Sequence, residues 1–416
     1  MKRLICTITL MLVAIGAKAR AEDAKTPPGP PVLVGYDGGF FIRTPNDKFL
    51  LKIGARLQAR LEYDNNETHE TADDGTALSA TDRDYKLAFS IPRARLKLFG
   101  NAFTKNLTYL FQVDFGKGFV MLRDFYADYA FFPKALQLRV GQFKRPFSRQ
   151  QITSSGNQEL VDRAITDEAF GAGRDLGLMF HDDYESSPPF EWALGVFNGT
   201  GEKPTFTGKG KGTGTVDQTA CDPATQTCPV VVDKVEVTDG KFFNVPTKFD
   251  PMLVARLGYN YGGIKGYSEA DLEGGPARFA IAASALADFD VDNDDKSSVR
   301  GEADLLLKVY GFDLTGAVYV ASAQDGKRFA DQKYASVGFH GQVGYVVKNL
   351  FQPVFRYAIV NPDGKDNNTQ ELLGGVAFYF FKHNVKWQTD GGAYLVENSA
   401  GGLTNYIVRT QLQFAI

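Results

Sequence analysis

The sequence has few of the residues on which metal centres, disulfide frameworks and most enzyme sites depend. Its 416 residues include three cysteines, two tryptophans and four histidines. The histidines are scattered, with no metal-type spacing, at positions His69, His181, His340 and His383. His340 and His383 also have no Ser and Asp partners at a recognisable spacing. We therefore expect no metal, no cofactor and no enzyme activity.

Two further absences narrow the class of protein. No run of eighteen or more apolar residues occurs, so helices that span a membrane are not expected. The 46 Lys and Arg residues do not exceed the 49 Asp and Glu residues, which argues against a nucleic-acid partner. In contrast, Phe (33), Tyr (18) and Gly (43) are abundant. This composition is typical of a β-rich chain with many tight turns.

The N-terminal residues have the pattern of an export signal. A basic start, Met1–Arg3, is followed by an apolar stretch over residues 4–17 and by the small-x-small site Ala19–Ala21. This pattern predicts a signal peptide over residues 1–21. Residues 22–48 then read as a Pro-rich periplasmic lead-in with a possible hairpin.

The cysteines agree with export from the cytoplasm. Cys6 is removed with the signal peptide, and Cys221 and Cys228 remain, separated by six residues. In an oxidising compartment we expect this close pair to form a small local disulfide. The alternative, two metal-binding thiols, has no nearby histidine to support it.

Alternation with a period of two is strong in the rest of the chain. Over the fifteen residues from Phe49 to Tyr63, one face is apolar and the other is mostly polar. Most strands of soluble proteins have only five or six residues. A long strand with an aromatic residue at each end of its apolar face is typical of a transmembrane β-strand. Residues 406–416 repeat the pattern.

Sixteen segments of this kind predict an all-β fold, a single transmembrane antiparallel β-barrel over residues 49–416. The number is even, as in single-chain bacterial barrels. The expected strands are 49–63, 86–103, 106–116, 120–132, 135–143, 174–182, 190–198, 251–261, 277–287, 299–310, 312–323, 333–347, 350–360, 370–382, 384–396 and 404–416.

Connection lengths give an independent test of the barrel. Every second connection is long and polar, as expected for external loops, and the others are short periplasmic turns. Three connections fit poorly. Residues 117–119 are short for an external loop, and 183–189 and 262–276 are long for turns. Acidic external loops such as 64–84 are expected to be solvated, although cation-bridged contact with lipopolysaccharide or a calcium site are alternatives.

Basic residues opposite the apolar face should line the lumen of the barrel. A ladder of Arg and Lys in a narrow aqueous pore attracts anions, and the planar guanidinium fork suits phosphate. The alternative is that these cations pair with inward acids such as Asp124 and Asp128 as a structural network. In the first five strands the predicted lumen cations are Lys52, Arg56, Arg60, Arg93, Arg95, Lys97 and Arg139.

Two local features bear on the shape of the pore. Residues 144–173 form a long connection after the fifth strand, and in porins such a loop folds into the lumen and narrows it. We therefore expect an inward-folded third external loop that carries Arg163. Pro92 interrupts the alternation of the second strand and predicts a bulge or bend there.

Several of these segments resemble the phosphate-selective porin O and P family. The central block consists of Val140–Ser148, Thr153–Ser155, Asp162–Arg163 and Phe170–Gly177. Weaker support comes from Asp124–Tyr129, Val196–Gly201, Pro353–Tyr357 and His383–Lys386. One departure is Ile416 at the end of the chain, where the family usually has Phe.

The resemblance implies a trimeric outer-membrane porin with anion-binding arginines in its lumen. By motif match, Arg93, Arg95 and Arg163 are the positions that carry over best. We therefore expect a water-filled channel for passive diffusion of small anions such as phosphate or polyphosphate, in contact with outer-membrane lipid and lipopolysaccharide. The alternatives are a general porin of the same fold and a plugged structural or adhesin barrel.

Overall fold

The computed structural model describes most of the chain after the N-terminal region. The described residues are 32–71, 77–118, 120–199, 205–216, 230–243, 251–289, 298–323, 334–362, 368–398 and 401–416. The predicted signal peptide and the pair Cys221 and Cys228 lie outside these residues.

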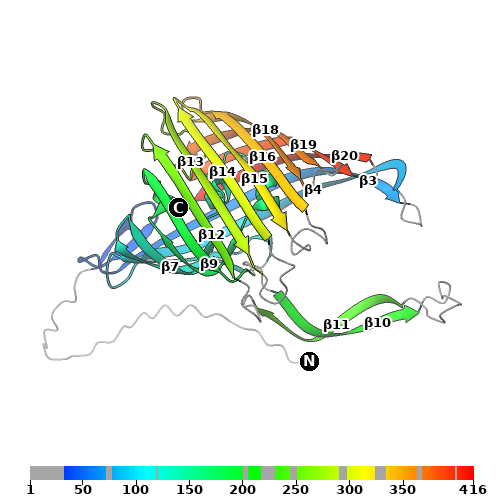
Figure 1. Cartoon of the computed structure of the whole chain (residues 1–416), viewed down its shortest axis with the longest axis horizontal. Coiled ribbons are helices and arrows are strands. Elements are labelled where there is room, and N and C mark those ends of the chain that lie inside the picture. Colours follow the sequence, from blue (N-terminus) through cyan, green and yellow to red (C-terminus); the bar gives the residue numbers. More distant parts are fainter. Residues whose placement is uncertain are drawn as a thin grey trace, which may run out of the picture.

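Sixteen strands in the described part of the chain form one closed antiparallel barrel (Figure 1). Each strand pairs with the next, β9 pairs directly with β12, and β20 pairs with β3 to close the ring. This confirms the predicted fold and strand number. The strands are β3 (Leu50–Thr71), β4 (Ala77–Asn101), β5 (Leu107–Asp114), β6 (Met121–Phe132), β7 (Leu136–Lys144), β8 (Arg174–His181), β9 (Phe190–Phe197), β12 (Met252–Tyr261), β13 (Arg278–Asp288), β14 (Ser298–Val309), β15 (Phe312–Ala323), β16 (Tyr334–Tyr345), β17 (Phe351–Asn361), β18 (Thr369–Phe381), β19 (Val385–Asn398) and β20 (Gly401–Ala415).

Four further strands lie outside the barrel wall. β1 (Leu33–Tyr36) and β2 (Phe40–Arg43) form a hairpin, and β2 also pairs with the start of β3. β10 (Thr205–Val216) and β11 (Val230–Phe243) form a separate two-stranded sheet within the connection between β9 and β12 (Figure 1). This connection was predicted only as one of the long polar external loops.

The alternation of side chains is inverted relative to that of a soluble protein. On β12, Leu253 and Leu257 are exposed on the outside, whereas Arg256 between them is buried. Exposed aromatic side chains such as Tyr261, Tyr310 and Phe381 lie at strand ends. A polar interior and an apolar exterior with aromatic residues at its edges are the properties that a bilayer imposes on a barrel.

The barrel wall is uneven in height. β3 and β4 have 22 and 25 residues and extend beyond their neighbours, whereas β5, β8 and β9 have eight residues each (Figure 1). The wall is low at β5, and the connection between β5 and β6 is short. The long strands β3 and β4, instead of a long loop, extend this part of the barrel.

Two β-bulges change which side chains face the interior. In β4 the register shifts between Ser90 and Arg93, which confirms the irregularity predicted at Pro92. In β6 the register shifts between Leu122 and Asp124, so Arg123 has no Cα partner on β5. A bulge residue escapes strict alternation, and this allows Arg123 to face the same cavity as its neighbours.

The described helices are short and lie in the connections between strands. They are α1 (Arg149–Ile152), α2 (Ile165–Phe170), and the single 3₁₀ turns η1 (Gly116–Gly118) and η2 (Tyr184–Ser186). In the part of the chain that the structure describes, no helix has the length and apolar character needed to cross a membrane.

Candidate functional site

Two neighbouring cavities lie along the inner face of β3–β8. The first has a volume of about 470 Å³ and the second of about 130 Å³, and Arg95 lines both. Charged side chains dominate the two linings. The first cavity is lined by Arg60, Arg93, Arg95, Asp114, Lys117, Arg123 and Asp162, and the second by Arg95, Lys97, Asp124, Arg139, Lys144, Arg174 and Glu185.

The register between β3 and β4 places basic residues directly opposite one another. Arg56 pairs with Arg95, and Gln58 with Arg93, so these side chains share the inner face of the barrel. Like charges at opposed positions repel each other. Arg95 is balanced by Asp114, whose Oδ2 accepts a hydrogen bond from Nε of Arg95 at 2.7 Å. The guanidinium group of Arg56 instead donates to two hydroxyl groups in the 145–173 segment, those of Ser154 and Ser155, at 3.0 and 3.2 Å.

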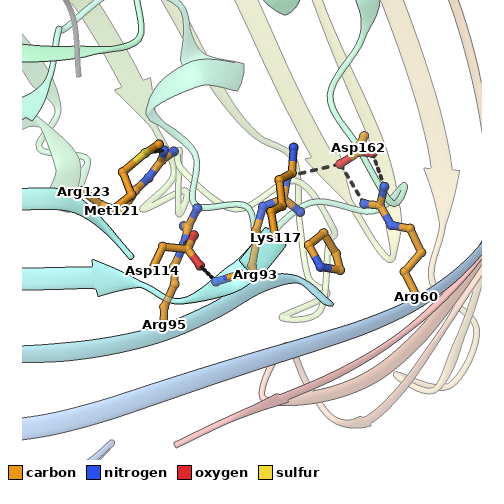
Figure 2. Close-up of a pocket in the computed structure, with 10 residues that line it drawn as sticks. Arg60, Arg93, Arg95, Asp114, Lys117, Met121, Arg123 and Asp162 are labelled. Carbon is orange, nitrogen blue, oxygen red and sulfur yellow. Dashed lines mark hydrogen bonds and ion pairs between the residues drawn. The ribbon is translucent and has the colours of Figure 1, made fainter. Parts of the chain in front are cut away.

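Asp162 lines the first cavity and accepts hydrogen bonds from three guanidinium groups, of which those of Arg60 and Arg93 are drawn in Figure 2. Arg60 donates to both of its carboxylate oxygens, at 2.8 and 2.9 Å. Arg93 donates to Oδ1 at 3.1 Å, and Arg409 donates to Oδ2 at 3.2 Å. Burial alone would raise the pKa of Asp162, but the three guanidinium groups outweigh it and hold the pKa well below its usual range.

The second cavity contains two ion pairs and three further cations, Arg95, Lys97 and Lys144. Arg174 donates to both carboxylate oxygens of Asp124, at 2.8 and 3.1 Å, and Arg139 donates to Glu185 at 2.7 Å. The Lys144 ammonium group instead donates to the backbone carbonyl groups of residues 152 and 153, at 2.7 and 3.2 Å. Such carbonyl contacts orient a cation without neutralising it.

The charges of the two cavities do not cancel. Nine basic side chains face four acidic ones along the combined lining, a formal excess of five positive charges. The chain as a whole has a net charge of −3. The positive charge is therefore concentrated along one side of the interior.

The predicted site residues lie in different places in the structure. Lys52 donates to the side chain and backbone of Asp37 at the N-terminal hairpin, away from both cavities. Arg163 lines neither cavity and donates to backbone carbonyl groups of its own segment, including Gln150 at 2.8 Å. Arg56 contacts the 145–173 segment. The predicted residues that line the cavities are Arg60, Arg93, Arg95, Lys97 and Arg139.

Several residues at the site were absent from the predicted set. Lys117 lies in the short connection between β5 and β6, and Arg123 lies at a bulge, so alternation gave no signal for either of them. Lys144 and Arg174 flank the 145–173 segment at strand ends, where alternation does not establish whether a side chain faces the lumen. Arg174 lies within the family-like block Phe170–Gly177, which was the one signal that could have identified it.

The 145–173 segment forms hydrogen bonds to inward-facing side chains on several strands. Arg149 Nε donates to Asp304 Oδ1 of β14 at 2.6 Å. Val161 N donates to Asp390 Oδ2 of β19 at 2.8 Å. Together with the contacts of Asp162 to β3 and β4, these hydrogen bonds connect the segment to strands far apart around the ring.

The 262–277 segment, which is long for a periplasmic turn, meets the 145–173 segment. Glu269 N donates to Asn157 O at 3.2 Å, and Glu159 N donates to Glu269 Oε2 at 2.9 Å. This connection is longer than a simple turn because part of it packs among the buried interior residues of the barrel.

Buried carboxyl groups surround this junction. The amide of Gln342 donates to Glu159 and Glu269, at 2.6 and 3.1 Å, and the amide of Gln352 donates to Glu159 and Asp313, at 2.6 and 2.9 Å. Burial raises the pKa of Glu159, and the neighbouring Asp313 adds to the effect. Burial and the neighbouring Glu159 likewise raise the pKa of Glu269.

The raised pKa values predict that alkaline pH weakens this junction. A carboxyl group whose pKa is raised on folding contributes its full stability below the unfolded pKa of about 4.3, and the contribution is lost as the pH rises through the folded value. We expect a lower free energy of unfolding at pH 8 than at pH 5 in vesicles, and a smaller pH dependence in Glu269→Gln. An unchanged pH dependence in Glu269→Gln would contradict this explanation.

The closed barrel, its apolar exterior and its charged interior are features that outer-membrane porins share. Residues 57–229 match the model of the family described as phosphate-selective porin O and P. This match contains most of β3, all of β4 and the 145–173 segment, and it confirms the resemblance found in the sequence.

Similar proteins agree with this placement. An "uncharacterized protein" of Aquifex aeolicus (strain VF5) is 24% identical over 281 residues, which cover 63% of this chain and 60% of that relative. Two solved structures share the fold. The anion-selective porin from Comamonas acidovorans has a TM-score of 0.52 at 10% identity and covers 88% of this chain and 99% of its own. The outer membrane channel DcaP of Acinetobacter baumannii has a TM-score of 0.54 at 15% identity and covers 90% and 99%.

Proposed function

We propose that this protein is an outer-membrane porin through which small anions diffuse passively, with phosphate-like oxyanions as preferred solutes. The observation that carries the proposal is the excess of nine basic over four acidic side chains along two adjoining cavities. In a narrow aqueous path such an excess stabilises anions and repels cations. Guanidinium groups add directional recognition of two oxygens at once.

The path in this proposal lies on one side of the barrel. The 145–173 segment occupies the interior opposite Arg93 and Arg95, and so narrows the channel towards the cationic strands. The other side is filled by the junction of this segment with residues 262–277. Solutes would then pass along the inner face of β3–β8, past Arg95, which lines both cavities.

Phosphate block of the chloride current tests this proposal. With the protein in a planar bilayer in KCl, we expect added inorganic phosphate to reduce the current, because it competes with chloride for the same guanidinium groups. Replacing chloride by the larger gluconate should also reduce the current, and replacing potassium by a larger cation should not. A current that follows the cation and ignores phosphate would refute the proposal.

A plugged structural barrel is the second candidate, because hydrogen bonds join the 145–173 and 262–277 segments across the interior. Such a barrel would give no conductance in the same bilayer. Export by the residue 1–21 signal peptide, the Cys221–Cys228 disulfide, contact with lipopolysaccharide and assembly as a homotrimer remain part of the proposal. The first two follow from the sequence, and the trimer follows from the family resemblance.

A further inference from the structure

The guanidinium groups of Arg60, Arg93 and Arg409 already bind a carboxylate of the protein itself, that of Asp162. Asp162 receives four hydrogen bonds from these three side chains at 2.8–3.2 Å. Its side chain keeps 30% of its surface exposed and lines the larger cavity. The side chain of Asp162 therefore already occupies a site on the proposed path that could bind an oxyanion.

The geometry of this contact matches that of a small oxyanion. Arg60 Nη1 and Nη2 each donate to a different oxygen of Asp162, the bidentate arrangement that carboxylate and phosphate form with a guanidinium group. Arg93 is turned towards the same carboxylate, and its other contact is to the neutral amide oxygen of Gln58 at 3.0 Å. Arg60 is also paired with Glu62 at 3.0 Å and Arg409 with Asp390 at 2.8 Å, whereas the ion pair of Arg93 is with Asp162.

We infer that Asp162 is a tethered competitor that sets how tightly the channel binds oxyanions such as phosphate. An arriving oxyanion takes the place of the Asp162 carboxylate at Arg60 and Arg93, and Asp162 returns when the oxyanion leaves. Because the carboxylate is attached to the same chain, its effective concentration at the site is high, and the apparent affinity for free anions is lowered accordingly. Rapid passage requires binding that is weak enough for release.

This inference rests on the proposed anion channel and assigns Asp162 a role that differs from a structural brace. A brace would hold the 145–173 segment in place, and its loss would loosen the segment and enlarge the pore. A competitor, once removed, leaves a stronger anion site behind. Chloride is a single-atom ion and cannot form the bidentate contact, so its current should change little in either case beyond the effect of pore width.

The test compares Asp162→Asn with Asp167→Asn in planar bilayers, with inorganic phosphate as the probe. Asp167 lies in the same segment, faces Arg163 at 3.6 Å and lines neither cavity. Both variants remove one negative charge from the segment, so a general change in the field of the pore is common to both. We expect the half-blocking phosphate concentration to fall at least tenfold in Asp162→Asn and to stay within twofold of the wild type in Asp167→Asn.

Three outcomes separate the possibilities. A half-blocking concentration in Asp162→Asn that equals that of Asp167→Asn overturns the inference and leaves the anion channel intact. A larger conductance without tighter phosphate block assigns Asp162 a bracing role and also overturns it. Cation selectivity in the wild type overturns the proposed function itself. If Asp162→Asn does not fold, Asp162→Ser removes the same carboxylate with a smaller side chain and should give the same tenfold fall.

Discussion

Replacing Arg93 and Lys117 together by glutamine is expected to lower the anion-to-cation permeability ratio about sixteenfold. Both side chains line the larger cavity. At about 8 Å in a medium like bulk water, one charge changes the energy of a passing ion by about 0.5 kcal/mol, a factor of about two. Each substitution removes this stabilisation from anions and an equal repulsion from cations. The two substitutions therefore change the ratio by four such factors, which multiply.

Zero-current potentials across a KCl gradient measure this ratio. Arg163→Gln is the matched control, because Arg163 is a predicted site residue that contacts backbone carbonyl groups and lines neither cavity. We expect its ratio to stay within twofold of the wild type. Equal losses in the double variant and in the control would show that the overall charge of the interior, rather than the cavity lining, determines selectivity.

Asp304→Ala is expected to destabilise the protein by about 3 kcal/mol, because it removes the nearest carboxylate of two buried guanidinium groups and leaves them Glu191, at 3.8 and 3.2 Å. Arg149 of the 145–173 segment donates to Asp304 at 2.6 Å, and Arg256 of β12 donates to it at 2.8 Å. All three side chains are buried. Asp304 is therefore one point at which the segment is attached to the far wall of the barrel.

Urea titration of the protein refolded into lipid vesicles measures this loss. Glu273→Ala is the matched control, because Glu273 forms a surface ion pair with Lys265 at 2.8 Å, and such pairs contribute about 1 kcal/mol or less. Limited proteolysis should also detect new cleavage within residues 145–173 of Asp304→Ala. If the two variants lose the same stability, the attachment of the segment does not depend on Asp304.

The barrel could be predicted from the sequence because a bilayer constrains every strand in the same way. Each strand must present apolar side chains to lipid and pair all of its backbone groups. Strands such as β15 (Phe312–Ala323) and β9 (Phe190–Phe197) therefore lie within a residue of the predicted ranges. The extension of β3 to Thr71 was not predicted, because beyond Tyr63 the strand leaves the apolar zone and its alternation ends.

The site was only partly predictable, because its arrangement depends on contacts between segments distant in sequence. Alternation correctly placed Arg60, Arg93 and Arg95 on the inner face, since that facing is a property of each strand. It carried no information on Asp162, whose position depends on the course of the 145–173 segment. The facing of Arg123 depends on a bulge that no proline or glycine in β6 marks.

The central claim is that the excess of basic side chains along β3–β8 makes this barrel an anion channel. The most direct measurement is the zero-current potential of the wild-type protein in a planar bilayer with a tenfold KCl gradient. We expect the sign of this potential to be the one that results when chloride moves down its gradient faster than potassium. A potential of the opposite sign would contradict it and would identify the basic residues as structural partners of Asp114, Asp124 and Asp162.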